Sequence, residues 1–378
     1  MAKFKIPPVS TLIGSSLLSF FQTLKGRKIS FLYYHKILFS GIIVILSIPF
    51  RLWEKLVFNR KIKKYQLKEA PVFILGHWRS GTTYLHNLLC QDPKAAFVTT
   101  YQSLFPEALG SKWLFKTFMK STMPDKRPSD NVKLSVELPQ EDEFALGNLN
   151  PYCFYHFFHF PHDYEDYYEK YVRFNIDKQK INRWEKDYKH LINKSLINTK
   201  GQRIILKNPA NTGRISLLTN IFPQSKFIFI YRNPVIIYLS TKKFFLNLFP
   251  TLQFQKTNEK EITEIILSLF EKFITDYERD KNMLSAGQLI EVRFEDLEEN
   301  PVAEVQKIYQ SLNINDFEKA FANFNSYVEK HKHYKKNKYE IDRKELEQVL
   351  KRWDFAMKNW NYNIPENINI IDYDLLKV

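Results

Sequence analysis

Apolar residues in this chain form short continuous runs that alternate with segments of helical periodicity. The runs at residues 72–75 (VFIL), 203–206 (RIIL), 227–231 (FIFIY) and 289–293 (LIEVR) are rich in Ile, Leu, Val and Phe, which is typical of strands buried on both faces. Helical spacing begins at Thr82, where Tyr84, Leu85, Leu88 and Leu89 share one face. The alternation of strands and helices predicts an α/β fold, a central parallel sheet flanked by helices.

Other elements follow from the same pattern. Further helices are predicted over residues 181–196, from about 212 to 221, and over 343–359. Another begins near residue 235, and a separate one after residues 294–301 ends at 312. A second strand is expected at residues 97–100, followed by a mostly apolar helix over 101–123. Residues 150–171 are dense in Tyr and Phe, beyond what helix packing needs, and we expect them to line a pocket or lid for a flat apolar ligand.

The N-terminal 68 residues differ from the rest of the chain in charge. The chain has a net charge of +15, and residues 1–68 contribute +12 of it, because their basic residues are accompanied by one acid, Glu54. We therefore divide the chain into a basic, apolar helical segment, 1–68, and a second domain, 69–378. The basic residues of the N-terminal segment flank two apolar stretches, 9–24 and 37–50. This arrangement favours an anionic membrane surface over nucleic acid as a partner.

The second apolar stretch is too short to cross a bilayer, since a spanning helix needs about 20 residues. We expect it to lie in the interface, giving peripheral membrane contact through residues 1–68. The alternative is a pair of helices packed on the second domain with solvated lysines. Cys90 and Cys153 are the chain's two cysteines, too few for a disulfide framework, which favours a cytoplasmic location, peripheral on the cytoplasmic face of a membrane.

The loop after the first strand carries the clearest chemical signal. Gly76 and Gly81 have the spacing of a phosphate-binding P-loop, but Thr82 stands where a nucleoside triphosphatase has its lysine. Arg79 supplies a cation inside the loop instead, and its planar donors suit a phosphate or sulfate oxygen. The loop therefore predicts an anion site that does not hydrolyse ATP or GTP; the alternative is an ordinary strand-to-helix turn.

Two more cations follow predicted strands. Lys207 ends the RIIL run and Arg232 follows FIFIY. Ligands of an open parallel sheet gather beyond the carboxyl ends of its strands, so we expect Arg79, Lys207 and Arg232 to meet at one edge.

Three motifs together resemble the sulfotransferase family: GHWRSGTT at the loop, LKNP at the end of the RIIL run, and YRNP with Ser240 eight residues after Arg232. The resemblance spans about 300 residues, from Pro71 to the C-terminus. It implies a P-loop nucleoside-triphosphate-hydrolase-like fold and 3′-phosphoadenosine 5′-phosphosulfate (PAPS) as co-substrate, with no metal. It also implies roles: Arg79, Ser80, Gly81, Thr82 and Thr83 on the 5′-phosphosulfate, Tyr84 on the adenine, Arg232 and Ser240 on the 3′-phosphate, Lys207 in catalysis, and Tyr334 and Lys336 in a closing loop. Arg79 is expected to act in catalysis as well, because with Lys207 it can neutralise the charge that builds on the leaving phosphate.

The chain departs from the family pattern at two positions. A histidine that many members have just after the catalytic lysine is absent here, and Phe294 replaces a tyrosine that often touches the adenine. Another group must then take the proton of the acceptor hydroxyl. The acids among apolar neighbours in LPQEDEFAL make Glu141 the first candidate base and Glu143 the second, with His77 and His156 as further alternatives.

These observations predict a PAPS-dependent sulfotransferase that acts on a hydroxyl of an apolar acceptor, such as a sterol, lipid or glycolipid. A metal site at His156, His159 and His162 is not expected, because Pro161 interrupts the helix that would align them. Two alternatives stay open. One is a kinase or nucleoside triphosphatase, which lacks its lysine here; the other is a catalytically inactive protein of the same fold that binds a membrane surface or a polyanion.

Overall fold

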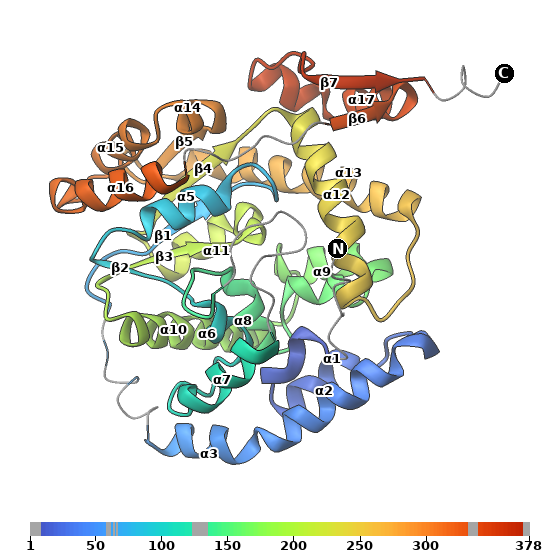
Figure 1. The fold of residues 1–378 in the computed structure, drawn as a ribbon, viewed down its shortest axis with the longest axis vertical. Coiled ribbons are helices and arrows are strands. Elements are labelled where there is room, and N and C mark those ends of the chain that lie inside the picture. Colours follow the sequence, from blue (N-terminus) through green and yellow to red (C-terminus); the bar gives the residue numbers. More distant parts are fainter. Residues whose placement is uncertain are drawn as a thin grey trace.

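The computed structural model describes residues 9–57, 62, 65, 67–122, 135–331 and 339–372 (Figure 1). Its centre is a five-stranded sheet of order β2-β3-β1-β4-β5, in which every neighbouring pair is parallel. The strands are β1 (Val72–Leu75), β2 (Ala95–Ala96), β3 (Arg203–Lys207), β4 (Lys226–Tyr231) and β5 (Leu289–Arg293). The four predicted strands of the sheet are confirmed, with β1 at its centre.

Both faces of the sheet are covered by helices, as its continuous apolar strands require. Val72 and Ile74 of β1 face a core shared with α5 (Thr82–Leu89), α15 (Pro301–Ser311) and α16 (Phe317–His331). Phe73 and Leu75 point the other way, into a larger core with α10 (Lys178–Thr199), α12 (Pro234–Leu252), α13 (Glu259–Asp280) and α17 (Arg343–Asn359). The fold is therefore the α/β sandwich of helices around a parallel sheet that the strand–helix alternation predicts.

The remaining elements complete the layers and connect them (Figure 1). The helices are α1 (Leu17–Leu24), α2 (Tyr34–Leu46), α3 (Ile48–Val57), α6 (Thr100–Leu104), α7 (Lys112–Thr122), α8 (Asp142–Leu149), α9 (Tyr164–Tyr171), α11 (Ile215–Ile221) and α14 (Phe294–Glu299). Short 3-10 helices include η1 (Thr11–Gly14), η2 (Phe31–Tyr33), η3 (Phe154–Phe158), η4 (Pro161–Asp163), η5 (Pro209–Gly213) and η6 (Lys281–Met283). A separate parallel pair, β6 (Tyr339–Asp342) and β7 (Ile368–Ile371), flanks α17.

The prediction of a strand at 97–100 followed by one helix to 123 is wrong. The strand is β2, two residues earlier, and Thr99 instead caps α6 by accepting a hydrogen bond from the Gln102 N–H at 3.2 Å. The predicted long helix is two helices, α6 and α7, because the chain between them contains Pro106 and Gly110.

The aromatic segment 150–171 also differs from expectation. Phe154, Phe157, Phe158 and Phe160 are at most 1% exposed and belong to the larger core. They therefore build the interior beside the sheet and do not line an open pocket or lid. The high density of aromatic rings in this segment is typical of a hydrophobic core, since aromatic side chains bury large areas and pack edge to face.

The N-terminal helices lie along one end of the molecule (Figure 1). Leu12, Phe20, Tyr33 and Val44 enter the larger core, so one face of this segment packs on the rest of the chain. Within the described residues, no single helix is both long enough and apolar enough to span a membrane. The segments Phe31–Leu46 and Ile48–Val57 meet both criteria only when they are taken together, and they are bent by 41° relative to each other. The division of the chain at residue 68 stays a prediction.

Candidate active site

The loop between β1 and α5 is held in a conformation that requires its two glycines. Gly76 has φ +134°, and a Cβ there would lie 2.4 Å from the Ile230 carbonyl oxygen. Gly81 has φ +100°, and a Cβ there would lie 2.1 Å from the Phe294 ring. Both positions combine a left-handed backbone with close contact, so glycine is needed at each. The loop thereby passes directly over the ends of β4 and β5.

The loop leads into the N-terminus of α5, which lacks a side-chain cap. Gly81 is the N-cap residue and has no side chain that could accept a hydrogen bond from the first turn. The N–H groups at the start of α5, in the turn that holds Thr82 and Thr83, are thus directed at the carboxyl edge of the sheet together with the positive end of the helix dipole. This arrangement is suited to an anion.

Three of the predicted residues meet on one side of this loop. The Arg79 Nε donates a hydrogen bond to the Ser240 Oγ at 2.8 Å, and the Arg232 guanidinium lies 3.5 Å from the Arg79 carbonyl oxygen. The same guanidinium stacks over the Phe294 ring at 4.3 Å, and burial lowers its pKa below the ordinary arginine value. Arg79, Arg232 and Ser240 are therefore adjacent, and Phe294 supports both the loop and Arg232.

Lys207 and Glu141 meet on the other side of the loop. Lys207, at the end of β3, is 2% exposed, and its ammonium lies 2.5 Å from Glu141 Oε1 and 3.4 Å from the Thr83 hydroxyl. The other oxygen of Glu141 accepts a hydrogen bond from the Tyr155 hydroxyl at 2.6 Å. That hydroxyl in turn accepts one from the Trp78 indole at 3.2 Å. A chain of contacts thus runs from the loop through Tyr155 and Glu141 to Lys207 and back to α5.

Glu143 occupies a different environment from Glu141, although it is two residues away. Its side chain is fully buried, and both of its oxygens accept hydrogen bonds from the Arg214 guanidinium, at 2.6 and 2.8 Å. Asn208, the Phe154 N–H and the Cys153 thiol also donate to it. Burial alone would raise the pKa of the Glu143 carboxyl, but Arg214 and these donors lower it. The geometry favours a structural part for Glu143 and leaves Glu141 as the candidate base.

The two histidine alternatives are unsuited to proton uptake near neutral pH. Burial lowers the pKa of His77 to about 3, and its ring packs against Phe270 and Phe273 in the core. Burial also lowers the pKa of His156 to about 3.

Asp142, between Glu141 and Glu143 in the sequence, is buried as well, and the loss of water raises the pKa of its carboxyl to about 7. Its hydrogen bond comes from the Tyr188 hydroxyl, at 2.7 Å, within the core.

Of the remaining predicted residues, Ser80 lies in the loop and Tyr84 on α5. Ser80 is buried and its hydroxyl donates to the His77 carbonyl oxygen, which braces the loop. Tyr84, on α5, lies 6.3 Å from Tyr327 of α16, ring centre to ring centre, and burial raises its pKa to about 12. Tyr334 and Lys336 lie outside the described residues. In the described part of the chain, no group of three or more His, Cys, Asp or Glu side chains is arranged to hold a metal.

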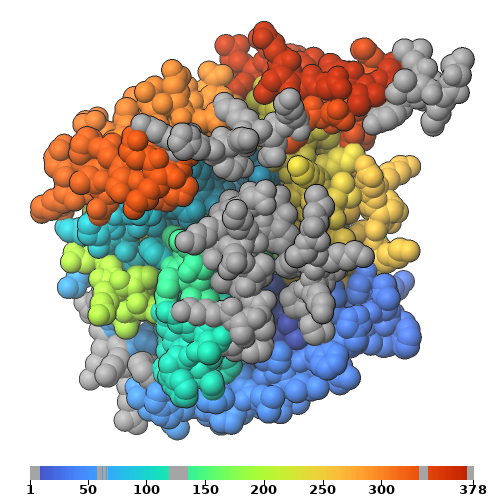
Figure 2. Space-filling view, viewed as in Figure 1, coloured from blue at the N-terminus to red at the C-terminus, as the bar shows by residue number. Residues whose placement is uncertain are grey.

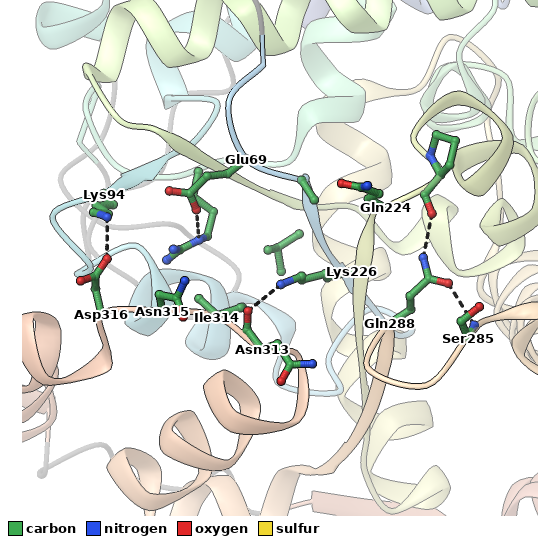
Figure 3. A pocket seen from close by; sticks show the side chains of 14 residues that line it. Glu69, Lys94, Gln224, Lys226, Ser285, Gln288, Asn313, Ile314, Asn315 and Asp316 are labelled. Atoms are coloured by element: carbon green, nitrogen blue, oxygen red, sulfur yellow. Dashed lines mark hydrogen bonds and ion pairs between the residues drawn. The ribbon is translucent and has the colours of Figure 1, made fainter.

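A cavity of about 620 Å³ lies at the opposite edge of the sheet, where the strands begin (Figure 3). Its charged groups have partners within the protein: Lys94 pairs with Asp316 at 2.5 Å, Arg203 pairs with Glu69 at 2.8 Å, and Lys226 donates to the Asn313 carbonyl oxygen at 2.9 Å. Ligands of parallel sheets bind at the carboxyl edge, where the loop and its cations lie. We therefore place the active site at the loop and not in this cavity.

Sequence reasoning did not identify Trp78 and Tyr155. Trp78 lies between Gly76 and Gly81, so its position in the loop was enough to make it a candidate site residue. Tyr155 is one of many aromatic residues in its segment, and nothing in that run distinguishes the ring that reaches Glu141. The hydroxyl of Thr212, which accepts a hydrogen bond from the Gly76 N–H at 2.8 Å, was likewise not foreseen.

Comparison with known proteins bears on the family and the fold of the chain. A model of the sulfotransferase family matches residues 71–319. The chain is 29% identical over 317 residues to the omega-hydroxy-beta-dihydromenaquinone-9 sulfotransferase Stf3 of Mycobacterium bovis and of Mycobacterium tuberculosis, covering 82% of this chain and 80% of the relative. Its fold is similar to that of sulfotransferase STF9 from Mycobacterium avium, with a TM-score of 0.69, 13% identity and coverage of 90% and 89%. STF1 from Mycobacterium tuberculosis is similar too, with a TM-score of 0.64, 15% identity and 89% of each chain covered.

Proposed function

The chain belongs to the sulfotransferase family, and from this premise we propose that it transfers the sulfuryl group of PAPS to a hydroxyl group of an apolar acceptor. The observation that carries the proposal is the meeting of three cations, Arg79, Lys207 and Arg232, around the uncapped N-terminus of α5. An adenosine carrying a 5′-phosphosulfate and a 3′-phosphate has two separate negatively charged groups. A site with cations on both sides of one helix end suits such a ligand.

The residues present fit PAPS on structural grounds. The first turn of α5 offers N–H donors that no side chain caps, and Lys207 adjoins the same turn through Thr83. These groups would hold the 5′-phosphosulfate. Arg232 and Ser240, joined through Arg79, would hold the 3′-phosphate. PAPS, when bound, supplies a sulfuryl group whose bond to the phosphate oxygen breaks as a bond to the acceptor oxygen forms.

The chain's own residues then have two tasks. Lys207 neutralises negative charge that develops on the phosphate side, where its ammonium is already oriented by Thr83 and Glu141. Glu141 accepts the proton of the acceptor hydroxyl, with its carboxylate held by Tyr155. Lys207 and Glu141 also neutralise each other, so neither charge is left alone in a poorly hydrated site.

The acceptor class rests on the relative and on the N-terminal segment. The 29% identical relative is named for a hydroxylated dihydromenaquinone, an apolar molecule with a hydroxyl group. A lipid-like alcohol of this class would be encountered at a membrane. We therefore propose that the protein works in the cytoplasm, peripherally attached to a membrane through its N-terminal segment.

Binding of 3′-phosphoadenosine 5′-phosphate (PAP), the product nucleotide, tests the donor site by isothermal titration calorimetry. Arg232→Ala should weaken PAP by about 10- to 150-fold, the equivalent of losing a charged hydrogen bond worth about 1.5–3 kcal/mol. Arg183→Ala, an exposed arginine on α10, is the matched control and should bind PAP like the wild type.

Unchanged PAP affinity in Arg232→Ala, or no PAP binding by the wild type, would refute the proposed donor. PAP binding without transfer to any hydroxylated acceptor would instead favour an inactive binding protein of this fold.

A further inference from the structure

The N-terminal helices expose a continuous apolar surface. Exposed apolar side chains lie on α2 and α3, among them Leu38, Ile42, Ile45, Leu46, Leu52 and Leu56. We call this surface the apolar face. Figure 2 shows α2, α3 and α7 side by side along one end of the molecule, and Phe50 of α3 contacts Phe115 of α7 at 5.2 Å between ring centres. An exposed apolar surface of this extent indicates an interaction site.

The opposite side of the same helices is fixed to the folded protein at both ends. The buried Lys36 ammonium of α2 donates hydrogen bonds to the carbonyl oxygens of Pro250 and Thr251, at 3.0 and 2.9 Å. The buried Glu54 carboxylate of α3 pairs with buried Lys194 of α10 and accepts a hydrogen bond from the Gly110 N–H at 2.8 Å. Because both helices are anchored along their inner side, they lie flat on the protein and cannot leave it to cross a bilayer without exposing these charges.

The exposed charges of the described N-terminal segment itself have one sign. Lys25, Lys28 and Lys55 are exposed, whereas Glu54, the acid of this segment, is buried against Lys194. Arg27 is neutralised from outside the segment by Asp163 and Asp166. The exposed part of the described segment therefore presents apolar side chains and lysines but no carboxylate. A second copy of the chain would bring like charges together, whereas an anionic lipid surface complements them.

We propose that the apolar face docks on an anionic lipid bilayer, with α2 and α3 lying in the plane of the interface and their apolar side chains in one leaflet. The exposed lysines contact lipid phosphates. This attachment enters one leaflet and does not span the membrane.

The N-terminal segment that carries the apolar face also packs on the helix that begins at the candidate base. Segment η1 packs on α8, where the Asn148 side chain donates to the Thr11 carbonyl oxygen at 3.0 Å. Glu141 is the N-cap residue at the other end of α8, so about 10 Å of helix separates it from the N-terminal segment. If the proposed function holds, docking holds the protein at the surface in which an apolar acceptor is dissolved. This step rests on the proposed function; the docking itself is argued from the exposed apolar side chains, the anchored inner side and the exposed lysines of α2, α3 and their flanks.

Cosedimentation with lipid vesicles tests the docking. The full-length protein should bind vesicles of equal phosphatidylglycerol and phosphatidylcholine and bind pure phosphatidylcholine vesicles much less. The double variant Ile42→Glu/Ile45→Glu should bind the anionic vesicles at least about tenfold more weakly, because it replaces inserted apolar groups with anions. Phe321→Glu on α16 is the matched control: it is 43% exposed, against 44% and 53% for Ile42 and Ile45, and should bind like the wild type.

A second variant tests whether the lysines contribute to vesicle binding separately from the inserted apolar side chains. A second assay tests whether the variants change docking without changing catalysis. Lys25→Gln/Lys28→Gln/Lys55→Gln should lose the preference for anionic vesicles. PAP affinity and transfer to a short-chain, water-soluble alcohol should be unchanged in all of these variants, which also reports that they fold. Equal vesicle binding by the Glu variants and the control would overturn the docking. So would a wild-type dimer in sedimentation velocity that Ile42→Glu/Ile45→Glu converts to monomer without any vesicle binding.

Discussion

Glu141→Gln tests the proposed base. The substitution keeps the size of the side chain and an oxygen that can accept the Tyr155 hydrogen bond, now 2.6 Å long. It removes the negative charge that pairs with the Lys207 ammonium and with it the ability to take a proton. Asp142→Asn is the matched control, since it neutralises the next carboxylate along the chain, which faces Tyr188 in the core.

The expected loss follows from the role. General-base catalysis contributes typically 10²- to 10⁴-fold, so kcat of Glu141→Gln should fall by that factor, equivalent to about 2.7–5.4 kcal/mol of activation free energy. PAP affinity should be equal to or higher than that of the wild type, because Lys207 then has no carboxylate partner in Glu141 and is available to the anion. A role in donor binding would give the reverse, with weaker PAP binding and little change in kcat.

The assay is formation of labelled sulfate ester at saturating PAPS and acceptor, run beside PAP titration for each variant. We expect a large fall in kcat for Glu141→Gln and wild-type kcat for Asp142→Asn. A kcat within about tenfold of the wild type in Glu141→Gln, or equal losses in both variants, would refute the assignment of Glu141 as base.

Three further predictions concern the frame of the site. Arg214→Met leaves the Glu143 carboxylate buried without its cation and should cost about 3–5 kcal/mol in urea unfolding; a loss under about 1 kcal/mol would contradict the pairing. Burial raises the pKa of the Asp142 carboxyl from 3.8 to about 7. The folded state therefore holds this proton more tightly than the unfolded state, and its stability falls as pH rises through this window. Asp142→Asn should therefore gain stability over the wild type between pH 4 and pH 7, by about 4 kcal/mol at most, and a gain that does not depend on pH would contradict this. Gly81→Ala places a Cβ 2.1 Å from the Phe294 ring at φ +100° and should weaken PAP binding in calorimetry while circular dichroism stays unchanged; wild-type affinity would show that the loop tolerates it.

The sheet could be predicted because its strands are buried on both faces. Such strands appear as continuous apolar runs, and the cation after each run marks the carboxyl edge on sequence grounds alone. Strand β2 has two residues and leaves no such run, so it was misplaced. The aromatic segment was misread because ring density is the same in a core and in a pocket wall; burial distinguishes them, and burial is a tertiary property.

The choice between Glu141 and Glu143 shows where sequence reasoning stops. Glu141 is the N-cap residue of α8, while Glu143 lies inside its first turn, rotated by roughly 200° about the helix axis. One carboxylate therefore faces Lys207 and the other faces Arg214. The start of a two-turn helix decides which acid reaches the site, and helix boundaries are the least certain part of a sequence-based prediction.

Turnover measures the central claim most directly. Incubation of the purified protein with ³⁵S-labelled PAPS and a panel of hydroxylated lipids, sterols, quinols and sugars should give one PAP for each sulfate ester formed on an apolar acceptor, without added metal. Labelled sulfate released as the free ion at the same rate with and without every acceptor, or no consumption of PAPS at all, would contradict the account.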